Sequence, residues 1–319
     1  MSLSEFELIN KYFRNAFNDS PDVKCGIGDD AAIISLPKGM DLVVTMDTLA
    51  GGIHFPDDAT AEDIGYKSLA VNLSDLAAMG ADPQWFTLAL TLPENDETWL
   101  QCFMTGMGVL ARQYKLSLVG GDLTRGPLSI TIQMQGHIPA GKALFRHGAE
   151  AGNLVYVSGT LGDAGLALLS LEKKYPVAEN DREAVMQRLN WPVPRIELGM
   201  ALRGIATSAI DISDGLLADL GHILESGSMG AEILLDKLPR SEALAQLPDM
   251  DAWELMLTSG DDYELCFTIP VNSKDQVEKK LSRICPLRCI GTITDSTGIK
   301  WLQPDGREFS PAKNAYTHF

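Results

Sequence analysis

Five short segments of this chain place aspartate beside glycine or at the end of an apolar run. They are Gly28-Asp29-Asp30, Thr45-Met46-Asp47, Gly121-Asp122, Asp211-Ile212-Ser213-Asp214-Gly215 and Gly260-Asp261-Asp262. Magnesium prefers oxygen ligands and keeps several of its waters, so scattered aspartates suit it better than Cys or His would. A neighbouring glycine lets a phosphate group come close to the backbone. The pattern predicts a hard-metal site for a phosphate ligand.

Two of these aspartates, Asp47 and Asp122, follow β-rich runs, so we expect each at a strand end, where a rigid sheet sets the position of functional groups. An aspartate after a strand can instead form only a local turn. Several together favour the metal site, because converging carboxylates repel one another unless a cation lies between them.

A third polar set lies in a segment that reads as a helix from about Thr60 to Met79. Ser68, Asn72 and Asp75 share one helical face, and most of the remaining circumference is apolar. Such a stripe is often a plain solvent face. The apolar content of the other faces favours the alternative, in which this stripe faces an internal site.

Two loops are weaker candidates for phosphate binding. Ser158–Gly165 has the spacing G-x-x-G-x-x-G, which matches neither the dinucleotide fingerprint nor the Walker A pattern, so a tight turn is the preferred interpretation. His54 lies in a glycine-rich loop just after Asp47. Arg146 lies where a cation could reach a polyphosphate, although it could equally be a solvated linker residue.

The elements that must position these residues alternate between β-rich runs and helical stretches. Phe6, Ile9, Phe13 and Phe17 predict an opening helix that packs an aromatic stripe on the body. A turn-rich stretch near 139–152 predicts a domain boundary. The expected strands are 31–36, 41–46, 85–92, 116–119, 128–137, 154–158, 209–212, 231–235, 263–269 and 287–292, and the other expected helices are 96–114, 162–171, 214–225 and 274–283.

Composition narrows the function classes. The chain has 319 residues, which favours two domains, and 26 Lys+Arg against 43 Asp+Glu, for a formal net charge of −17. That charge opposes nonspecific binding to nucleic acid or to an anionic membrane. The five cysteines are odd in number and lack a Cys-x-x-Cys spacing, so they indicate neither a disulfide framework nor a zinc site. No signal peptide or membrane span is visible in the sequence, and we therefore expect a cytoplasmic protein.

These motifs, taken in order, resemble the thiamine-monophosphate kinase family, within the ATP-binding superfamily of aminoimidazole ribonucleotide synthetase. The matching segments are Gly26–Ala32, Thr45–Thr48 with Gly52–Phe55, Lys67–Ala81, Gly120–Asp122, Asp211–Leu216 and Ser259–Leu265. They span nearly the whole chain, and the run Val71–Ala81 is especially distinctive.

The resemblance implies ATP-dependent transfer of the γ-phosphoryl group directly onto thiamine monophosphate, giving thiamine diphosphate in the last step of its biosynthesis. The acceptor phosphate is already an oxyanion, so no catalytic protein base is implied. Several Mg²⁺ ions would be held by Asp30, Thr45, Met46, Asp47, Asp75, Asp122, Asp211 and Asp214. ATP would contact Gly121, Asp122, Arg146 and Ser213, and thiamine monophosphate would contact His54, Asp261 and Phe319. The family usually has Gly-Glu-Asp where this chain has Gly260-Asp261-Asp262, so the shorter Asp261 must reach the same group or act through water.

The implied fold is α/β (α+β) with two domains, like that of aminoimidazole ribonucleotide synthetase. Residues 1–138 would form an ATP- and metal-binding domain whose sheet closes into a barrel-like sheet across a homodimer. Residues 150–306 would form a C-terminal α/β domain, and residues 307–319 a tail at the substrate site, with the reaction between the domains. The alternatives are another enzyme of the superfamily, such as selenophosphate synthetase, aminoimidazole ribonucleotide synthetase or the hydrogenase-maturation dehydratase, and a noncatalytic nucleotide-binding module.

Overall fold

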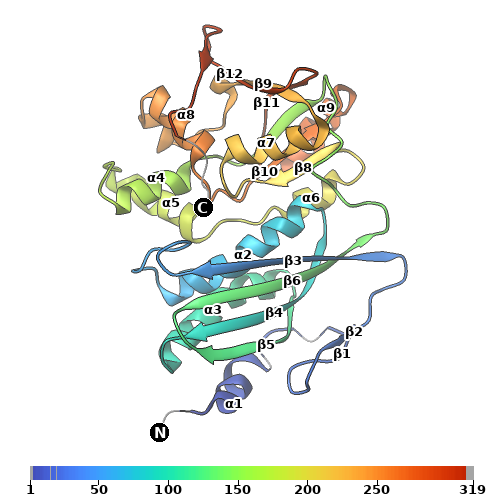
Figure 1. Cartoon of the computed structure of the whole chain (residues 1–319), viewed down its shortest axis with the longest axis vertical. Coiled ribbons are helices and arrows are strands. Elements are labelled where there is room, and N and C mark those ends of the chain that lie inside the picture. The colour runs from blue at the N-terminus through green and yellow to red at the C-terminus, as the bar shows by residue number, and fades with distance from the viewer. Residues whose placement is uncertain (1–2, 15, 19, 314–319) are drawn as a thin grey trace. The chain divides into compact units, whose positions relative to one another are not determined.

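The computed structural model describes residues 3–14, 16–18 and 20–313. The chain divides into two compact units, which are described separately (Figure 1). Unit 1 comprises Met1–Leu76 and Ala81–Gly141, and unit 2 comprises Ala77–Gly80 and Lys142–Phe319. The domain limits expected from sequence stay a prediction.

Unit 1 is built on an open four-stranded sheet with the order β3-β6-β4-β5. Its strands are β3 (Met40–Ala50), β4 (Asp82–Leu92), β5 (Ser117–Arg125) and β6 (Ser129–Pro139). β6 pairs antiparallel with β3 and with β4, whereas β4 and β5 are parallel. A two-stranded ladder of β1 (Val23–Cys25) and β2 (Ile33–Ile34) lies apart from this sheet.

Two long helices, α2 (Ala61–Ala78) and α3 (Glu97–Gln113), cover one face of this sheet (Figure 1). Thr60 caps α2, because its Oγ1 accepts the Asp63 N–H at 3.1 Å and donates to the Asp63 carboxylate at 2.8 Å. The two helices touch through their backbones. A Cβ added at Gly65 would lie 2.0 Å from the Phe103 carbonyl oxygen, and one at Gly106 would lie 1.9 Å from that of Glu62.

The opening helix differs from the sequence expectation. An α-helical turn, α1 (Glu5–Leu8), passes into a π-helical turn, η1 (Ile9–Phe13), and the helix ends there. The wider turn breaks the periodicity on which the aromatic stripe was predicted. Phe13 is buried, but Phe6 is 74% exposed, so the expectation that Phe6 packs on the body is wrong. Phe17 lies beyond the helix and contacts the Phe86 ring.

Unit 2 contains a seven-stranded sheet with the order β13-β12-β9-β11-β7-β10-β8. The strands are β7 (Leu154–Ser158), β8 (Ser208–Asp211), β9 (Gly230–Leu234), β10 (Leu265–Ile269), β11 (Leu287–Thr294), β12 (Gly298–Leu302) and β13 (Glu308–Phe309). Its α-helices are α4 (Asp163–Leu171), α5 (Glu179–Asn190), α6 (Ile196–Leu202), α7 (Leu216–Gly227), α8 (Asp249–Thr258) and α9 (Lys274–Lys280). Apolar side chains of β7, β8, β9 and α7 form one buried cluster, which includes Val157, Ile210, Ile233 and Leu220.

Sequence periodicity missed α5, α6, α8, β12 and β13. α5 is polar over most of its surface and buries only Val185 and Leu189, so its apolar stripe is too narrow to stand out. The predicted strand 263–269 begins instead at Leu265, because Tyr263 has a φ of 50°, which is outside the β region. No helix among the described residues is both long and apolar enough to cross a membrane.

Candidate functional site

The polar stripe of α2 is an internal face, as the sequence favoured. Ser68 and Asn72 are fully buried, and their side chains bond the carbonyl oxygens one turn earlier in the helix. Asn72 Oδ1 also accepts the Asp47 N–H at 3.2 Å, and the Thr45 hydroxyl donates to the Asp75 carboxylate. α2 therefore holds Asp75 close to Thr45 and Asp47 of β3.

The Asp47 carboxyl is the most perturbed group in this part of unit 1. Burial, and then the negative charge of Asp75, raises its pKa to about 6. A carboxyl group that is costly to ionise in the free protein is stabilised in its charged form when a cation binds beside it. The pair of Asp47 and Asp75 is thus an oxygen donor set that a hard divalent cation would stabilise.

Neither Asp47 nor Asp122 ends a strand, which corrects the sequence expectation. Asp47 lies inside β3, which pairs with β6 from Met40 to Ala50, and Asp122 lies inside β5, which continues to Arg125. Pairing with a long neighbour extends each strand beyond the apolar run that the sequence displays. Neighbouring residues of a strand point to opposite faces, so the Met46 side chain, 61% exposed, points away from Thr45 and Asp47. A metal contact from Met46 would therefore have to use its backbone.

Asp30, Gly121 and Asp122 line one cavity of about 780 Å³ in unit 1. Its walls come from the opening helix, from residues 26–32 and from β4 and β5. Gly121 has a φ of 148°, and a Cβ there would lie 1.9 Å from the Leu88 carbonyl oxygen, so only glycine allows this approach of the strands. Arg14 also lines the cavity, and its guanidinium lies against Gly28. Sequence reasoning missed Arg14.

Unit 2 brings Ser213 and Asp261 side by side. The Asp261 N–H donates to the Ser213 carbonyl oxygen at 2.9 Å, and Asp211 ends β8 directly before this segment. Asp219, in the first turns of α7, accepts the Asp214 and Gly215 N–H groups at 3.1 Å each. Burial raises the pKa of Asp219 to about 7. Sequence reasoning missed Asp219, although an acidic residue soon after Ser-Asp-Gly is a signal of a helix start.

The Ser158–Gly165 loop is filled by side chains of the protein itself. The Gly162 N–H, at the N-terminus of α4, donates to both oxygens of the buried Asp262 carboxylate at 2.9 and 3.0 Å. Asp163 accepts hydrogen bonds from Thr160 and Ser241. An internal carboxylate thus takes the position that a bound anion would occupy, which agrees with the preferred interpretation of this loop as a tight turn.

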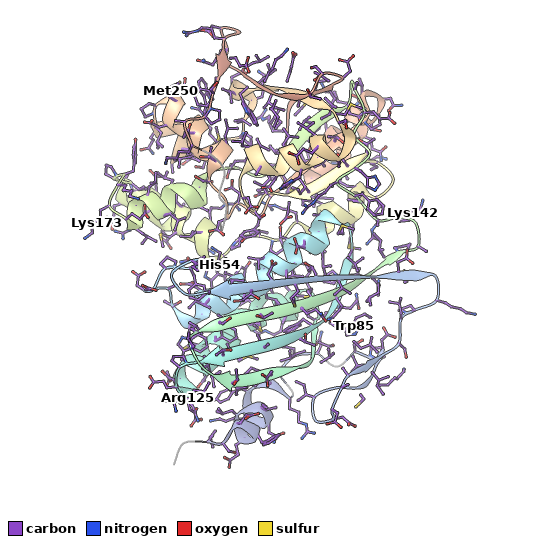
Figure 2. The ribbon with its side chains drawn as sticks, viewed as in Figure 1. His54, Trp85, Arg125, Lys142, Lys173 and Met250 are labelled. Carbon is purple, nitrogen blue, oxygen red and sulfur yellow. The ribbon has the colours of Figure 1, made fainter. Side chains whose placement is uncertain are left out.

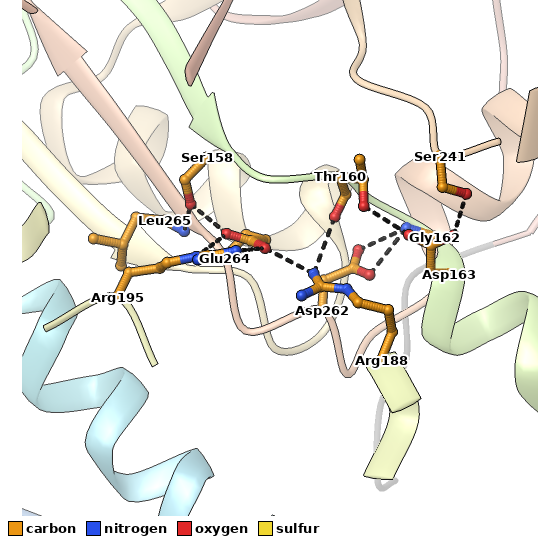
Figure 3. A network of polar contacts seen from close by, with 10 residues as sticks. All are labelled: Ser158, Thr160, Gly162, Asp163, Arg188, Arg195, Ser241, Asp262, Glu264 and Leu265. Atoms are coloured by element: carbon orange, nitrogen blue, oxygen red, sulfur yellow. Dashed lines mark hydrogen bonds and ion pairs between the residues drawn. The ribbon is translucent and has the colours of Figure 1, made fainter. Parts of the chain in front are cut away.

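A second buried carboxylate, Glu264, is held between two arginines (Figure 3). Arg188 donates to it at 2.7 Å, and Arg195 donates through two nitrogens at 2.6 and 2.5 Å. The Ser158 hydroxyl completes its shell at 2.5 Å. We call Glu264, Arg188, Arg195 and Ser158 the Glu264 clamp. Arg188 and Arg195 lie far from Glu264 in sequence, so nothing local predicted the clamp.

The remaining predicted residues lie at the edges of these groups. His54 follows β3 (Figure 2). Its Nδ1 accepts the Ala50 N–H at 3.0 Å, which leaves the proton of the neutral ring on Nε2. Arg146 is exposed, and its carbonyl oxygen accepts the Ser226 hydroxyl at 3.1 Å. Phe319 lies outside the described residues.

Within residues 3–14, 16–18 and 20–313, no three His, Cys, Asp or Glu side chains are gathered closely enough to hold a metal ion. Magnesium commonly binds through one or two carboxylates, together with waters and substrate phosphates. The pair of Asp47 and Asp75 fits such a shared coordination. It does not fit a closed cage made by protein alone.

Comparison with known proteins gives the family. The domain family described as AIR synthase related protein matches residues 28–138 with its N-terminal domain and residues 150–301 with its C-terminal domain. The thiamine-monophosphate kinase of Salmonella typhimurium is 45% identical over 323 residues, which cover 100% of this chain and 99% of the relative. The chain belongs to the thiamine-monophosphate kinase family.

Solved structures support this family assignment. The crystal structure of thiamine-monophosphate kinase from Stenotrophomonas maltophilia K279a has 46% identity and a TM-score of 0.87, covering 97% of this chain and 99% of that one. A structure of AaThiL complexed with AMPPCP and TMP has 31% identity and a TM-score of 0.77, covering 92% of each chain. The family fold, mixed α/β with two AIR synthase-type domains, confirms the fold class expected from sequence.

Proposed function

We propose that this chain phosphorylates thiamine monophosphate with ATP to give thiamine diphosphate. The observation that carries this proposal is the similar structure of AaThiL complexed with AMPPCP, an analogue of ATP, and TMP. The 45% identity to the Salmonella enzyme over the full length of this chain agrees with it. The reaction is a direct in-line transfer of the γ-phosphoryl group.

Catalysis here consists of positioning and charge neutralisation. The acceptor phosphate is already an oxyanion, so no side chain has to remove a proton from it. The site has to align two anionic phosphate groups, but most of its candidate side chains are carboxylates, which are anionic too. Magnesium, when bound, would neutralise phosphate oxygens between those carboxylates and the substrates.

The proposed ligands of Mg²⁺ are Asp30, Asp47, Asp75, Asp122, Asp211 and Asp214, with Thr45 and the Met46 backbone beside them. The raised pKa of Asp47 beside Asp75 supports this proposal in unit 1. For ATP we propose Gly121 and Asp122, which line the 780 Å³ cavity, together with Arg146 and Ser213. For thiamine monophosphate we propose His54, Asp261 and Phe319.

We also propose that the chain works as a homodimer in the cytoplasm. Leu42, Val44 and Met46 form an apolar stripe on the outer face of β3, and they are 52%, 49% and 61% exposed. β3 is an edge strand of the described sheet and is 11 residues long. Such a stripe on a long edge strand favours burial by another protein surface. A second copy of this chain would cover it and complete the sheet.

A turnover assay tests the function. Purified protein with ATP, Mg²⁺ and thiamine monophosphate should yield thiamine diphosphate and ADP in equal amounts, measured by chromatography. A preparation that binds ATP but makes no thiamine diphosphate at any Mg²⁺ concentration would refute the kinase proposal. It would favour the noncatalytic nucleotide-binding module instead. Release of inorganic phosphate without thiamine diphosphate would indicate another reaction of the superfamily.

A further inference from the structure

Residues Gly260–Glu264 form a strap that joins α8 to β10, and its backbone is strained. Of the described residues, five non-glycine residues have a positive φ, and two of these, Asp261 at 66° and Tyr263 at 50°, are in the strap. In each such residue the side chain lies too close to the backbone, so this conformation is unfavourable relative to ordinary backbone. Left-handed residues of this kind persist only where the surroundings determine them. The contacts around the strap must therefore hold Asp261 and Tyr263 in this conformation.

The buried residues of the strap fix it from below. Asp262 is bonded by the Gly162 N–H, and Glu264 is held in its clamp (Figure 3). The backbone is fixed as well: the Tyr263 N–H donates to the Ile212 carbonyl oxygen, and the Ile212 N–H donates to that of Glu264, both at 2.8 Å. A Cβ at Gly260 would lie 2.1 Å from the Ser213 carbonyl oxygen. The strap cannot shift without breaking these contacts.

The two strained residues bond each other. The Tyr263 hydroxyl donates to Asp261 Oδ1 at 3.1 Å, and both side chains are only partly buried. Aspartate is a short side chain, so the direction of its carboxylate depends strongly on its backbone and on any partner. Here the left-handed backbone of Asp261 sets where its side chain starts, and the Tyr263 hydroxyl sets how its carboxylate is turned.

We infer that Tyr263 is a positioning residue, whose hydroxyl aims the Asp261 carboxylate at the thiamine part of the substrate. This inference rests on the proposed function, in which Asp261 contacts thiamine monophosphate. Thiamine carries a cationic thiazolium ring and an amino group on its pyrimidine, and a carboxylate complements both. The clamp and the Asp262 bonds act through the strap and keep this pair in place.

A double-mutant cycle tests the inference. Tyr263→Phe keeps the ring and removes only the hydroxyl, so it should raise the KM for thiamine monophosphate about tenfold, the loss expected for one hydrogen bond to a charged group. The KM for ATP should stay the same, and so should the midpoint of thermal unfolding. In an Asp261→Ala background, Tyr263→Phe should have no further effect on kcat/KM. Tyr175→Phe, which removes a hydroxyl elsewhere in unit 2, is the matched control and should change none of these values.

Two results would overturn the inference. One is an effect of Tyr263→Phe that persists at full size in the Asp261→Ala background. The other is an equal rise of both KM values together with a fall in the unfolding midpoint, which would make Tyr263 a structural residue only. Both outcomes need an active wild-type enzyme. A wild type that makes no thiamine diphosphate would refute the proposed function itself, so the two failures are distinguishable.

Discussion

The carboxylates of Asp47 and Asp122 lie in different surroundings. Asp47 is partly buried beside another acid, and its pKa rises to about 6. Asp122 is exposed to the cavity of unit 1, on a strand that glycine brings close to its neighbour. The protonation state of Asp47 should therefore change near pH 6.

Replacing Asp122 with asparagine should remove activity and leave the fold intact. The two side chains have nearly the same size, and the position is exposed, so the midpoint of thermal unfolding should change by less than about 2 °C. Turnover should fall on the order of 100-fold, because an amide cannot replace a carboxylate in neutralising a cation. Asp41→Asn, at an exposed position of β3, is the control and should keep full activity. Near-normal turnover of Asp122→Asn would rule out a metal role for this residue.

The Mg²⁺ requirement should depend on pH through Asp47. Below its pKa of about 6 this group holds a proton that a cation must displace. The Mg²⁺ concentration for half-maximal activity should therefore rise as pH falls through about 6, approaching tenfold per pH unit. The effect on stability has the opposite sign: the folded protein binds this proton more tightly than the unfolded chain, so Asp47 lowers stability as pH rises from its ordinary value toward 6. A flat Mg²⁺ requirement from about pH 5 to about pH 8 would contradict the assignment.

The residue types at the site were readable in the sequence, but their surroundings were only partly so. Ser68, Asn72 and Asp75 could be predicted as a shared face, because helical spacing depends on local geometry alone. Glu264 could not be linked to Arg188 and Arg195, because their meeting depends on how β10, α5 and the start of α6 fold together. The strand ends were placed too early at Asp47 and Asp122, because pairing with β6 and β4 continues past the apolar runs.

The secondary-structure elements of unit 2 meet around charges that water barely reaches. In the Glu264 clamp, the strap before β10 supplies Glu264, α5 supplies Arg188 and β7 supplies Ser158. Glu264 is fully buried, whereas the two arginines remain 20% and 15% exposed at their side chains. Removing the negative charge would leave two cations facing each other without the carboxylate that both of them bond.

Glu264→Gln should therefore destabilise the protein strongly, by roughly 3–5 kcal/mol in the free energy of unfolding measured with urea. The control is Glu232→Gln, which breaks the pair of Glu232 with Lys300 at 3.0 Å. That pair is 46% and 53% exposed. Solvent screens such a pair, so its loss should cost at most about 1 kcal/mol. Equal losses in the free energy of unfolding for the two substitutions would show that the Glu264 clamp stabilises the fold no more than an exposed ion pair does.

The molecule as a whole combines a strong negative charge with an exposed apolar stripe on β3. The net charge of −17 keeps copies apart at long range, so association needs a specific contact. Leu42, Val44 and Met46 provide an apolar face on β3 for that contact. High salt should consequently favour the proposed dimer by screening the repulsion between copies.

Val44→Asp should weaken the dimer, since it places a charge in the middle of the stripe. The expected result is a halved mass in light scattering after size-exclusion chromatography, with the far-UV circular dichroism spectrum unchanged. Val271→Asp is the control, because Val271 is 60% exposed in a short helical turn of unit 2 and lies on no such stripe. If the wild-type chain itself runs as a monomer at micromolar concentration, the dimer proposal is wrong.

The contact of α2 with α3 at Gly65 and Gly106 limits how this enzyme can change over evolution. Any side chain at either position would have to push a helix backbone aside, since its first carbon would overlap a carbonyl oxygen at 2.0 or 1.9 Å. Moving α2 would carry Asn72 and Asp75 away from β3. Two glycines without any functional group thus constrain the proposed metal-binding face as firmly as the aspartates do. A substitution at this helix crossing should therefore disturb the site more than a substitution in an exposed loop of unit 1.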